Sequence, residues 1–131
     1  PDWQVRLMQY VAERARTPVD PCAPVCALFA AGGVAAMTGQ DFAAEWAGRF
    51  TTTRGALRVL RRAGYADHIA LVAAHFAEIP VSFAAPGDLA VIPTDGVPAV
   101  GIVQGEAIYV QSETGIGAMP LLSAVLAFRV V

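Results

Sequence analysis

Apolar side chains recur every three or four residues along the first part of the chain, a spacing that predicts helices. An amphipathic helix is expected over about 2–16, where Trp3, Leu7 and Val11 share one face. The stretch from about Pro24 to Met37 is apolar on every side. A helix without a polar face is a central, buried one, so this segment is expected in the middle of the core.

Three shorter helices are predicted before residue 80. Asp41 is a candidate cap for a short helix that carries Phe42 and Trp46, and Thr53 is a candidate cap for a second helix that ends at Gly64. A third helical segment is expected from Asp67 to about Ala77.

Short β-prone runs separated by turn residues follow from about residue 81. Strands are predicted at Leu89–Ile92, Val97–Val103, Ala107–Gln111 and Ala127–Val131, with a turn over Glu113–Gly117 and a helical turn starting at Pro120. Connections this short favour an antiparallel meander, because parallel strands need crossovers of about a dozen residues or more. The pattern therefore predicts a single α+β domain over 1–131, with a helical part at about 1–80 and a β-rich part at about 81–131.

The composition is unusually apolar for a chain of this size. Hydrophobic residues make up 56% and charged residues 15%, whereas charged residues average about 25% in soluble domains. Gly, Pro, Asp or Arg interrupts every run before the roughly 18 apolar residues that a membrane span needs. We therefore expect no membrane span, and we expect the surplus apolar surface to face a protein partner. The start of the chain lacks the features of a signal peptide, so export by that route is not expected.

Charge argues against a nucleic-acid role for the whole domain. The net charge is −2, so no global basic field gathers polyanions. Arg54, Arg58, Arg61 and Arg62 nevertheless form a stripe at i, i+4, i+7 and i+8 of one predicted helix. This stripe could grip nucleic acid or an acidic partner, or it could be a solvated helix face balanced by nearby acids.

Cys26 is the leading candidate for chemistry. A thiol in the first turn of a helix feels the partial positive charge of the exposed amides, which raises its thiolate fraction. The alternative is that Cys26 is an ordinary small buried hydrophobe. Cys22 and Cys26 also form a C-x₃-C pair, which leaves open a redox module, or a zinc site that would need both His68 and His75 as well.

Three motifs occur in a fixed order along the chain. Cys26-Ala27-Leu28-Phe29 opens an apolar helix, Pro86-Gly87-Asp88-Leu89-Ala90-Val91 opens the sheet, and Val100-Gly101-Ile102-Val103 is followed by Gly105. Together they resemble the NlpC-type cell-wall cysteine peptidases, a branch of the papain-like fold, and most closely the branch encoded among phage tail genes and in gene-transfer-agent clusters. The resemblance covers nearly the whole chain and implies a papain-like domain with helices packed on an antiparallel meander or half-barrel.

The resemblance also implies roles for individual residues. It puts the nucleophile at Cys26 and the residue that orients the base at Gln111. The base itself falls on Ala99, where the family has a histidine, and alanine cannot accept a proton. His68 and His75 are the other residues that could supply a base, from one face of the fifth predicted helix.

Two functional hypotheses follow. The first is a structural tail-tip or baseplate component of a phage-type particle, a catalytically degenerate domain that docks on other tail-tip or hub proteins. It would be made in the bacterial cytoplasm, reside in the virion and need no cofactor, metal or nucleic acid. The alternative is an active cysteine peptidase that degrades peptidoglycan and aids DNA entry.

Overall fold

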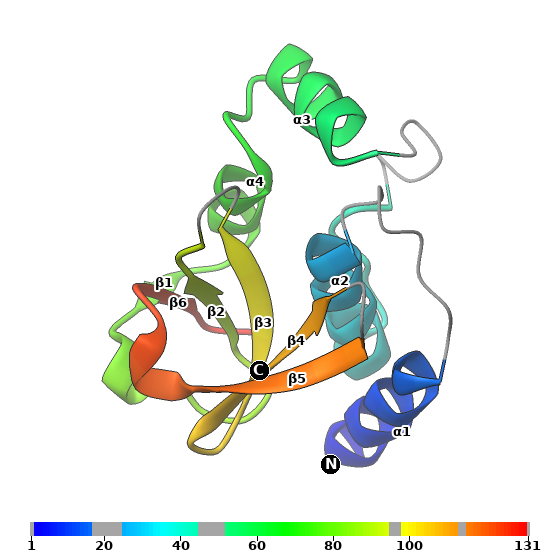
Figure 1. Cartoon of the computed structure of the whole chain (residues 1–131), viewed down its shortest axis with the longest axis vertical. Coiled ribbons are helices and arrows are strands. Elements are labelled where there is room, and N and C mark those ends of the chain that lie inside the picture. Colours follow the sequence, from blue (N-terminus) through cyan, green and yellow to red (C-terminus); the bar gives the residue numbers. More distant parts are fainter. Residues whose placement is uncertain (1, 17–24, 45–51, 95–97, 113–114, 131) are drawn as a thin grey trace.

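Helices come first and strands later in the computed structural model of the chain (Figure 1), which describes residues 2–16, 25–44, 52–94, 98–112 and 115–130. The helices in these residues are α1 (Trp3–Ala15), α2 (Val25–Thr38), α3 (Thr53–Arg62) and α4 (His68–His75). The strands are β1 (Glu78–Ile79), β2 (Leu89–Ile92), β3 (Ala99–Gln104), β4 (Ala107–Ser112), β5 (Gly115–Pro120) and β6 (Leu126–Phe128), and two short 3₁₀ turns are η1 (Val81–Phe83) and η2 (Leu121–Ser123). The predicted α+β class is confirmed.

The strands form one antiparallel sheet in the order β1-β6-β2-β3-β4-β5. From β2 to β5, neighbours in the sheet are also neighbours along the chain, which is the predicted meander. The last strand departs from it, because β6 returns to lie between β1 and β2. The two ends of the β-rich part are therefore side by side at one edge of the sheet.

Three local predictions differ from the structure. Residues 115–117 of the turn predicted over Glu113–Gly117 belong to β5, whose Gly and Pro residues look like turn material locally but pair with β4 along six residues, and residues 113–114 lie outside the described residues. The cap of α3 is Thr52, not Thr53, because the Thr52 hydroxyl accepts the hydrogen bond from the Gly55 amide at 3.0 Å. Residues 42–44, at the start of the helix predicted after Asp41, form a turn, and Trp46 lies outside the described residues.

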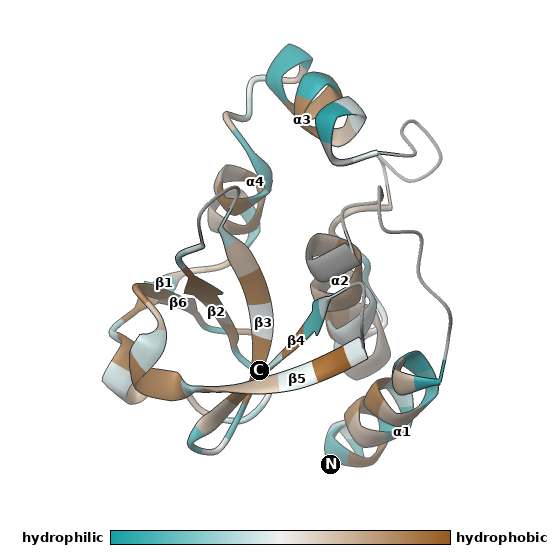
Figure 2. Cartoon of the chain, viewed as in Figure 1, coloured by the Kyte–Doolittle hydropathy of each residue, from teal (hydrophilic) through white to brown (hydrophobic). Residues whose placement is uncertain are grey.

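Two apolar cores lie on opposite faces of the sheet. The helix face, as we call it, packs against α1 and α2 and carries Leu89, Val91, Val100, Ile102 and Phe128. The opposite face is closed by the two 3₁₀ turns and carries Ala90, Ile92, Val103 and Ile108. Helix α2 has almost no hydrophilic positions (Figure 2), as expected of a helix that contacts α1, β3 and β4.

A buried carboxylate joins the start of the sheet to the end of the chain. Asp88 is 1% exposed, and it accepts hydrogen bonds at 3.0 Å from the amides of Ala85 and Val130. The Arg129 guanidinium lies 3.4 Å from the same carboxylate. A buried charge needs such partners, so Asp88 stabilises the region where the start of β2, the segment after η1 and the C-terminal segment meet.

Candidate functional site

Helix α2 carries Cys26 as its second residue. The side chain of Cys26 and all of Cys22 lie outside the described residues. Two glycines of α2 leave notches, which are spaces without a side chain that side chains of other elements fill. A Cβ at Gly32 would come within 2.3 Å of the Tyr10 hydroxyl oxygen, and one at Gly33 within 2.3 Å of Ile102 Cδ1.

Tyr10 fills the notch at Gly32. Its ring stacks on Phe29 with centroids 5.6 Å apart, and its hydroxyl donates to the Phe29 carbonyl oxygen at 2.8 Å. Burial raises the pKa of Tyr10 to about 12, so this donor keeps its proton over the physiological range. The glycine pair therefore admits side chains from α1 and β3, which fixes α2 over the helix face.

Gln111 is buried on β4, at 1% exposure, and is engaged by α1. Its Oε1 accepts from the Arg14 guanidinium at 3.3 Å, and its Nε2 donates to the Arg14 carbonyl oxygen at 3.5 Å. Carbonyl groups in the last turn of a helix have no partner inside the helix. Gln111 thus serves as a cap for α1, and both ends of its amide are occupied by one residue.

Ala99 begins β3 on the face opposite to the helix face. Side chains alternate along a strand, so Ala99 shares its face with Gly101, where a Cβ would meet Ile108 Cγ2 at 2.4 Å. Gln111 shares its face with Tyr109, which pairs with Ile102 of the helix face. The structure therefore puts the predicted base position and the predicted orienting residue on opposite faces of the sheet.

His68 is the histidine that approaches the start of β3. It is the first residue of α4, after the cap Asp67, and its Nε2 lies 2.9 Å from the carbonyl oxygen of Pro98. A carbonyl only accepts, so Nε2 carries a proton. Burial lowers the pKa of His68, which favours the neutral ring and leaves Nδ1 as the nitrogen with a free lone pair. The sequence gives no signal for this contact, because the partners are 30 residues apart.

His75 lies at the other end of α4 and faces a different region. Its Nδ1 is 2.9 Å from the Leu71 carbonyl oxygen of its own helix. Together with Phe42 and Phe76 it lines a hollow of about 570 Å³ beside the end of α2. Residues from α4 and from the turn after α2 line this aromatic hollow, and the sequence pattern predicted no site there.

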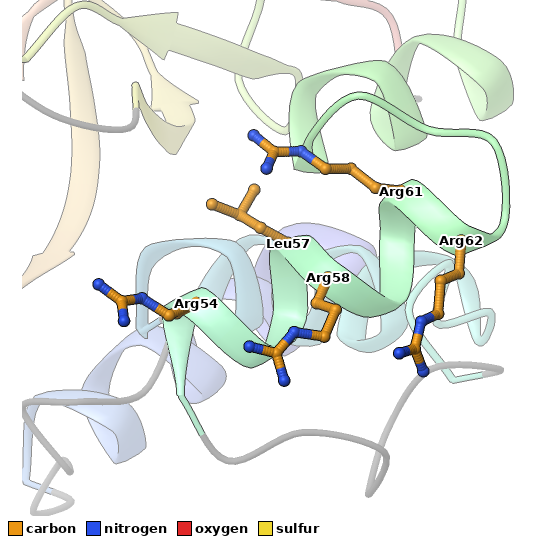
Figure 3. A pocket seen from close by; sticks show the side chains of 5 residues that line it. All are labelled: Arg54, Leu57, Arg58, Arg61 and Arg62. Atoms are coloured by element: carbon orange, nitrogen blue, oxygen red, sulfur yellow. The ribbon is translucent and has the colours of Figure 1, made fainter.

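The predicted arginine stripe lies on the outer side of α3. Arg54, Leu57, Arg58, Arg61 and Arg62 line a shallow hollow of about 740 Å³ (Figure 3). Among the described residues, no group of three or more His, Cys, Asp or Glu side chains is placed to hold a metal ion. In the same part of the chain, no helix has the length and apolar character to cross a bilayer.

An α+β domain with a buried central helix over an antiparallel sheet is the class that this geometry defines. The chain belongs to the family DUF6950, described as a domain of unknown function, which it matches over residues 1–130. No curated protein matches the sequence.

Proposed function

We propose that the chain is a tail-tip or baseplate component of a phage-type particle, built on an NlpC-like, papain-like fold that has lost its chemistry and acts structurally. The family resemblance in the sequence supplies the tail assignment. The identity and location of residue 99 give the best support for a loss of catalytic activity. It is an alanine, and it lies on the sheet face away from α2, the helix that carries Cys26.

The hydrogen bonds of Gln111 support the same proposal. In the resemblance, Gln111 would orient a basic side chain, but its amide is bonded at both ends to Arg14. A cysteine peptidase needs a base to activate the thiol and an acid to protonate the leaving amine, and such help is worth about 10²–10⁴-fold in rate. In a domain without that base, only the cysteines that are already in the thiolate form could act as nucleophiles.

Exposed apolar side chains support a docking role. Phe83 is 68%, Leu122 83% and Val125 60% exposed. Phe83 and Leu122 belong to η1 and η2, which contact each other. We call these three residues the apolar end. Large apolar side chains gathered on one surface are typical of protein interaction sites.

The alternative function, an active peptidoglycan peptidase, is favoured by one observation. His68 bonds to the carbonyl of Pro98, directly before the position where the resemblance expects the base. Its neutral ring has a free nitrogen lone pair, which is what a general base requires. A base displaced from β3 to α4 would restore the missing function.

Variants in a particle-producing strain test the proposal. Cys26→Ala should leave particle number and infectivity or DNA-transfer titre unchanged, whereas Leu122→Asp should prevent assembly. Gln4→Asp, which adds the same charge at an exposed position of α1, is the matched control and should assemble normally. A large loss of titre from Cys26→Ala in correctly assembled particles would contradict the structural role.

A cell-wall assay separates the two functions directly. Purified domain and whole particles would be incubated with purified peptidoglycan, and released peptides would be identified by mass spectrometry. The structural proposal expects none. Hydrolysis that disappears in both Cys26→Ser and His68→Gln would instead establish the peptidase with a displaced base.

A further inference from the structure

Helix α3 has an apolar inner side and a cationic outer side. Ala56 and Leu60 are 7% and 4% exposed, and Leu60 packs with Leu71 of α4. The outer side turns away from this contact and carries the arginines that line the hollow in Figure 3. In Figure 1 the helix stands at one end of the molecule, far from the sheet.

The guanidinium groups of this side have no acidic partner within the described part of the chain. The salt bridges there join Arg6 to Asp2 and Arg129 to Asp88. Arg61 donates from Nε to the carbonyl oxygen of Ala66 at 3.3 Å, which leaves its terminal nitrogens available.

Like charges four residues apart destabilise a helix, each pair by about 0.2–0.5 kcal/mol. Arg54, Arg58 and Arg62 form two such pairs in succession. Because α3 bears this repulsion without an internal carboxylate to offset it, an external anion would relieve it.

Leu57 lies between the arginines and is partly exposed. An apolar position flanked by charges is the arrangement with which one helix docks on another, since the apolar side chain packs and the flanking charges select the partner. A phosphate backbone would use the charges but would leave Leu57 without an apolar contact. The net charge of −2 also gives no long-range attraction for nucleic acid.

We propose that the outer side of α3 binds an acidic amphipathic helix of another protein, with carboxylates at i, i+4 and i+8 facing Arg54, Arg58 and Arg62 and an apolar side chain against Leu57. Arginine suits this role because its planar fork can bond a carboxylate at two points. The helices α1 to α4 contain no pair of carboxylates four residues apart, so a second copy of these helices would not be complementary. This inference goes beyond the tail assignment and holds whether or not the domain resides in a particle.

Binding of a defined peptide tests the proposal. The probe is a fluorescent helical peptide with Glu at i, i+4 and i+8 and Leu between them, titrated with the full chain at about 50 mM and 300 mM salt and followed by anisotropy. Matched probes are the same peptide with Gln in place of Glu and a 20-base-pair DNA duplex. We expect the Glu peptide to bind more tightly than either, and more weakly at the higher salt concentration, because exposed charges are screened.

Substitutions locate the binding surface. Arg58→Glu should weaken binding by at least about tenfold, since it exchanges an attraction for a repulsion, and Leu57→Ala should weaken it without changing the salt dependence. Arg16→Glu makes the same charge change at an exposed position after α1 and should have little effect. Circular dichroism checks that each variant is folded, and Arg58→Ala replaces Arg58→Glu if the latter is not.

Three outcomes would overturn the proposal. One is equal binding of the Gln and Glu peptides by the folded chain, or no binding of either. Another is tighter binding of the duplex, which would assign the surface to nucleic acid. The third is an equal loss of affinity in Arg16→Glu and Arg58→Glu, which would mean that the attraction reflects overall charge rather than this surface.

Discussion

Single residues decide where the central helix sits. Gly32 and Gly33 leave space on α2 for Tyr10 from α1 and Ile102 from β3, and no other residue type would leave both spaces open. Side chains rather than backbone occupy both spaces. The cost of glycine in a helix, about 1 kcal/mol each, is offset by the packing that these notches allow.

Gly32→Ala should therefore destabilise the domain by about 1–3 kcal/mol in spite of the better helix propensity of alanine, because the new methyl group would displace the Tyr10 ring. Urea unfolding followed by circular dichroism measures the change. Gly117→Ala is the control, since no atom lies within 4 Å of a Cβ at that position, and it should leave the unfolding free energy nearly unchanged. A Gly32→Ala variant more stable than the parent would show that Tyr10 does not fill the notch.

His68 should make stability depend on pH. Burial holds its pKa below the ordinary value near 6.5, so the unfolded chain binds a proton at a higher pH than the folded chain does. The unfolding free energy should therefore be highest above about pH 6.5 and fall as the pH is lowered through that value.

Unfolding free energies of the parent and of His68→Gln between pH 5 and pH 8 measure this contribution. The difference between the two proteins should change with pH in the stated direction, and the side-chain amide of the introduced glutamine can still donate to the Pro98 carbonyl. A constant difference across the range would mean that His68 does not titrate with a lowered pKa in the folded state.

Elements are joined by a few buried polar contacts as well as by apolar packing. Asp88 connects the start of β2 to the segment after η1 and to the C-terminal segment, and Gln111 connects β4 to the last turn of α1. The helices α3 and α4 begin with side-chain caps from Thr52 and Asp67. The contacts of Asp88 with Val130 and of Gln111 with Arg14 explain why segments distant in the chain keep their relative positions.

Asp88→Ala should cost about 2–4 kcal/mol, because the amides of Ala85 and Val130 would lose a charged acceptor, and a hydrogen bond to a charged group contributes about 1.5–3 kcal/mol. Thermal and urea unfolding measure the loss. Arg129→Ala removes only the exposed partner of the ion pair and should cost about 1 kcal/mol or less. Equal losses in the two variants would assign the stabilisation to the ion pair instead of the amide contacts.

Thr52→Ala should destabilise α3 by about 1 kcal/mol, because the Gly55 amide would lose its cap. Thr52→Asp should retain most of the stability, since a carboxylate also accepts that hydrogen bond. Thr53→Ala is the comparison. A larger loss of stability in Thr53→Ala than in Thr52→Ala would indicate that the cap is Thr53, the residue that the sequence pattern predicted. Helicity at 222 nm during urea unfolding reports on all three variants.

The whole molecule combines a buried double core with surfaces that are unusually apolar or cationic. The two sides of the sheet are covered by different elements, α1 and α2 on one and the 3₁₀ turns on the other. The apolar end and the outer side of α3 remain outside both cores. Substitutions on these two surfaces should therefore leave the fold intact.

Neighbouring residues of η2 test this separation of surface from core. Leu122 is 83% exposed, whereas Leu121 packs on the core of the opposite face. Leu122→Asp should leave the unfolding free energy of the isolated domain within about 0.5 kcal/mol, and Leu121→Asp should lower it by several times as much because a charge would enter apolar surroundings. If both variants unfold alike, Leu122 contributes to the fold and cannot report on assembly.

Much of the architecture followed from the sequence. The helices α1, α2 and α4 and the strands β2 to β4 were predicted near their observed bounds, because local spacing and turn residues specify them. β5 was missed, since its glycines and proline favour a turn until β4 supplies a partner strand. The site was less predictable. Gln111 was selected for its chemistry, but its contact with Arg14 spans 97 residues.

By itself, the sequence determined the fold class, the central position of α2 and the absence of a histidine at position 99, because composition and periodicity are properties of the chain. Only the tertiary structure decided on which face of the sheet that position lies, that His68 approaches Pro98, and that the arginines of α3 face outward without a carboxylate among the described residues. These features depend on strand register and on contacts between distant segments. Both arise when the helices and the sheet bury their apolar faces against each other, and no local pattern encodes them.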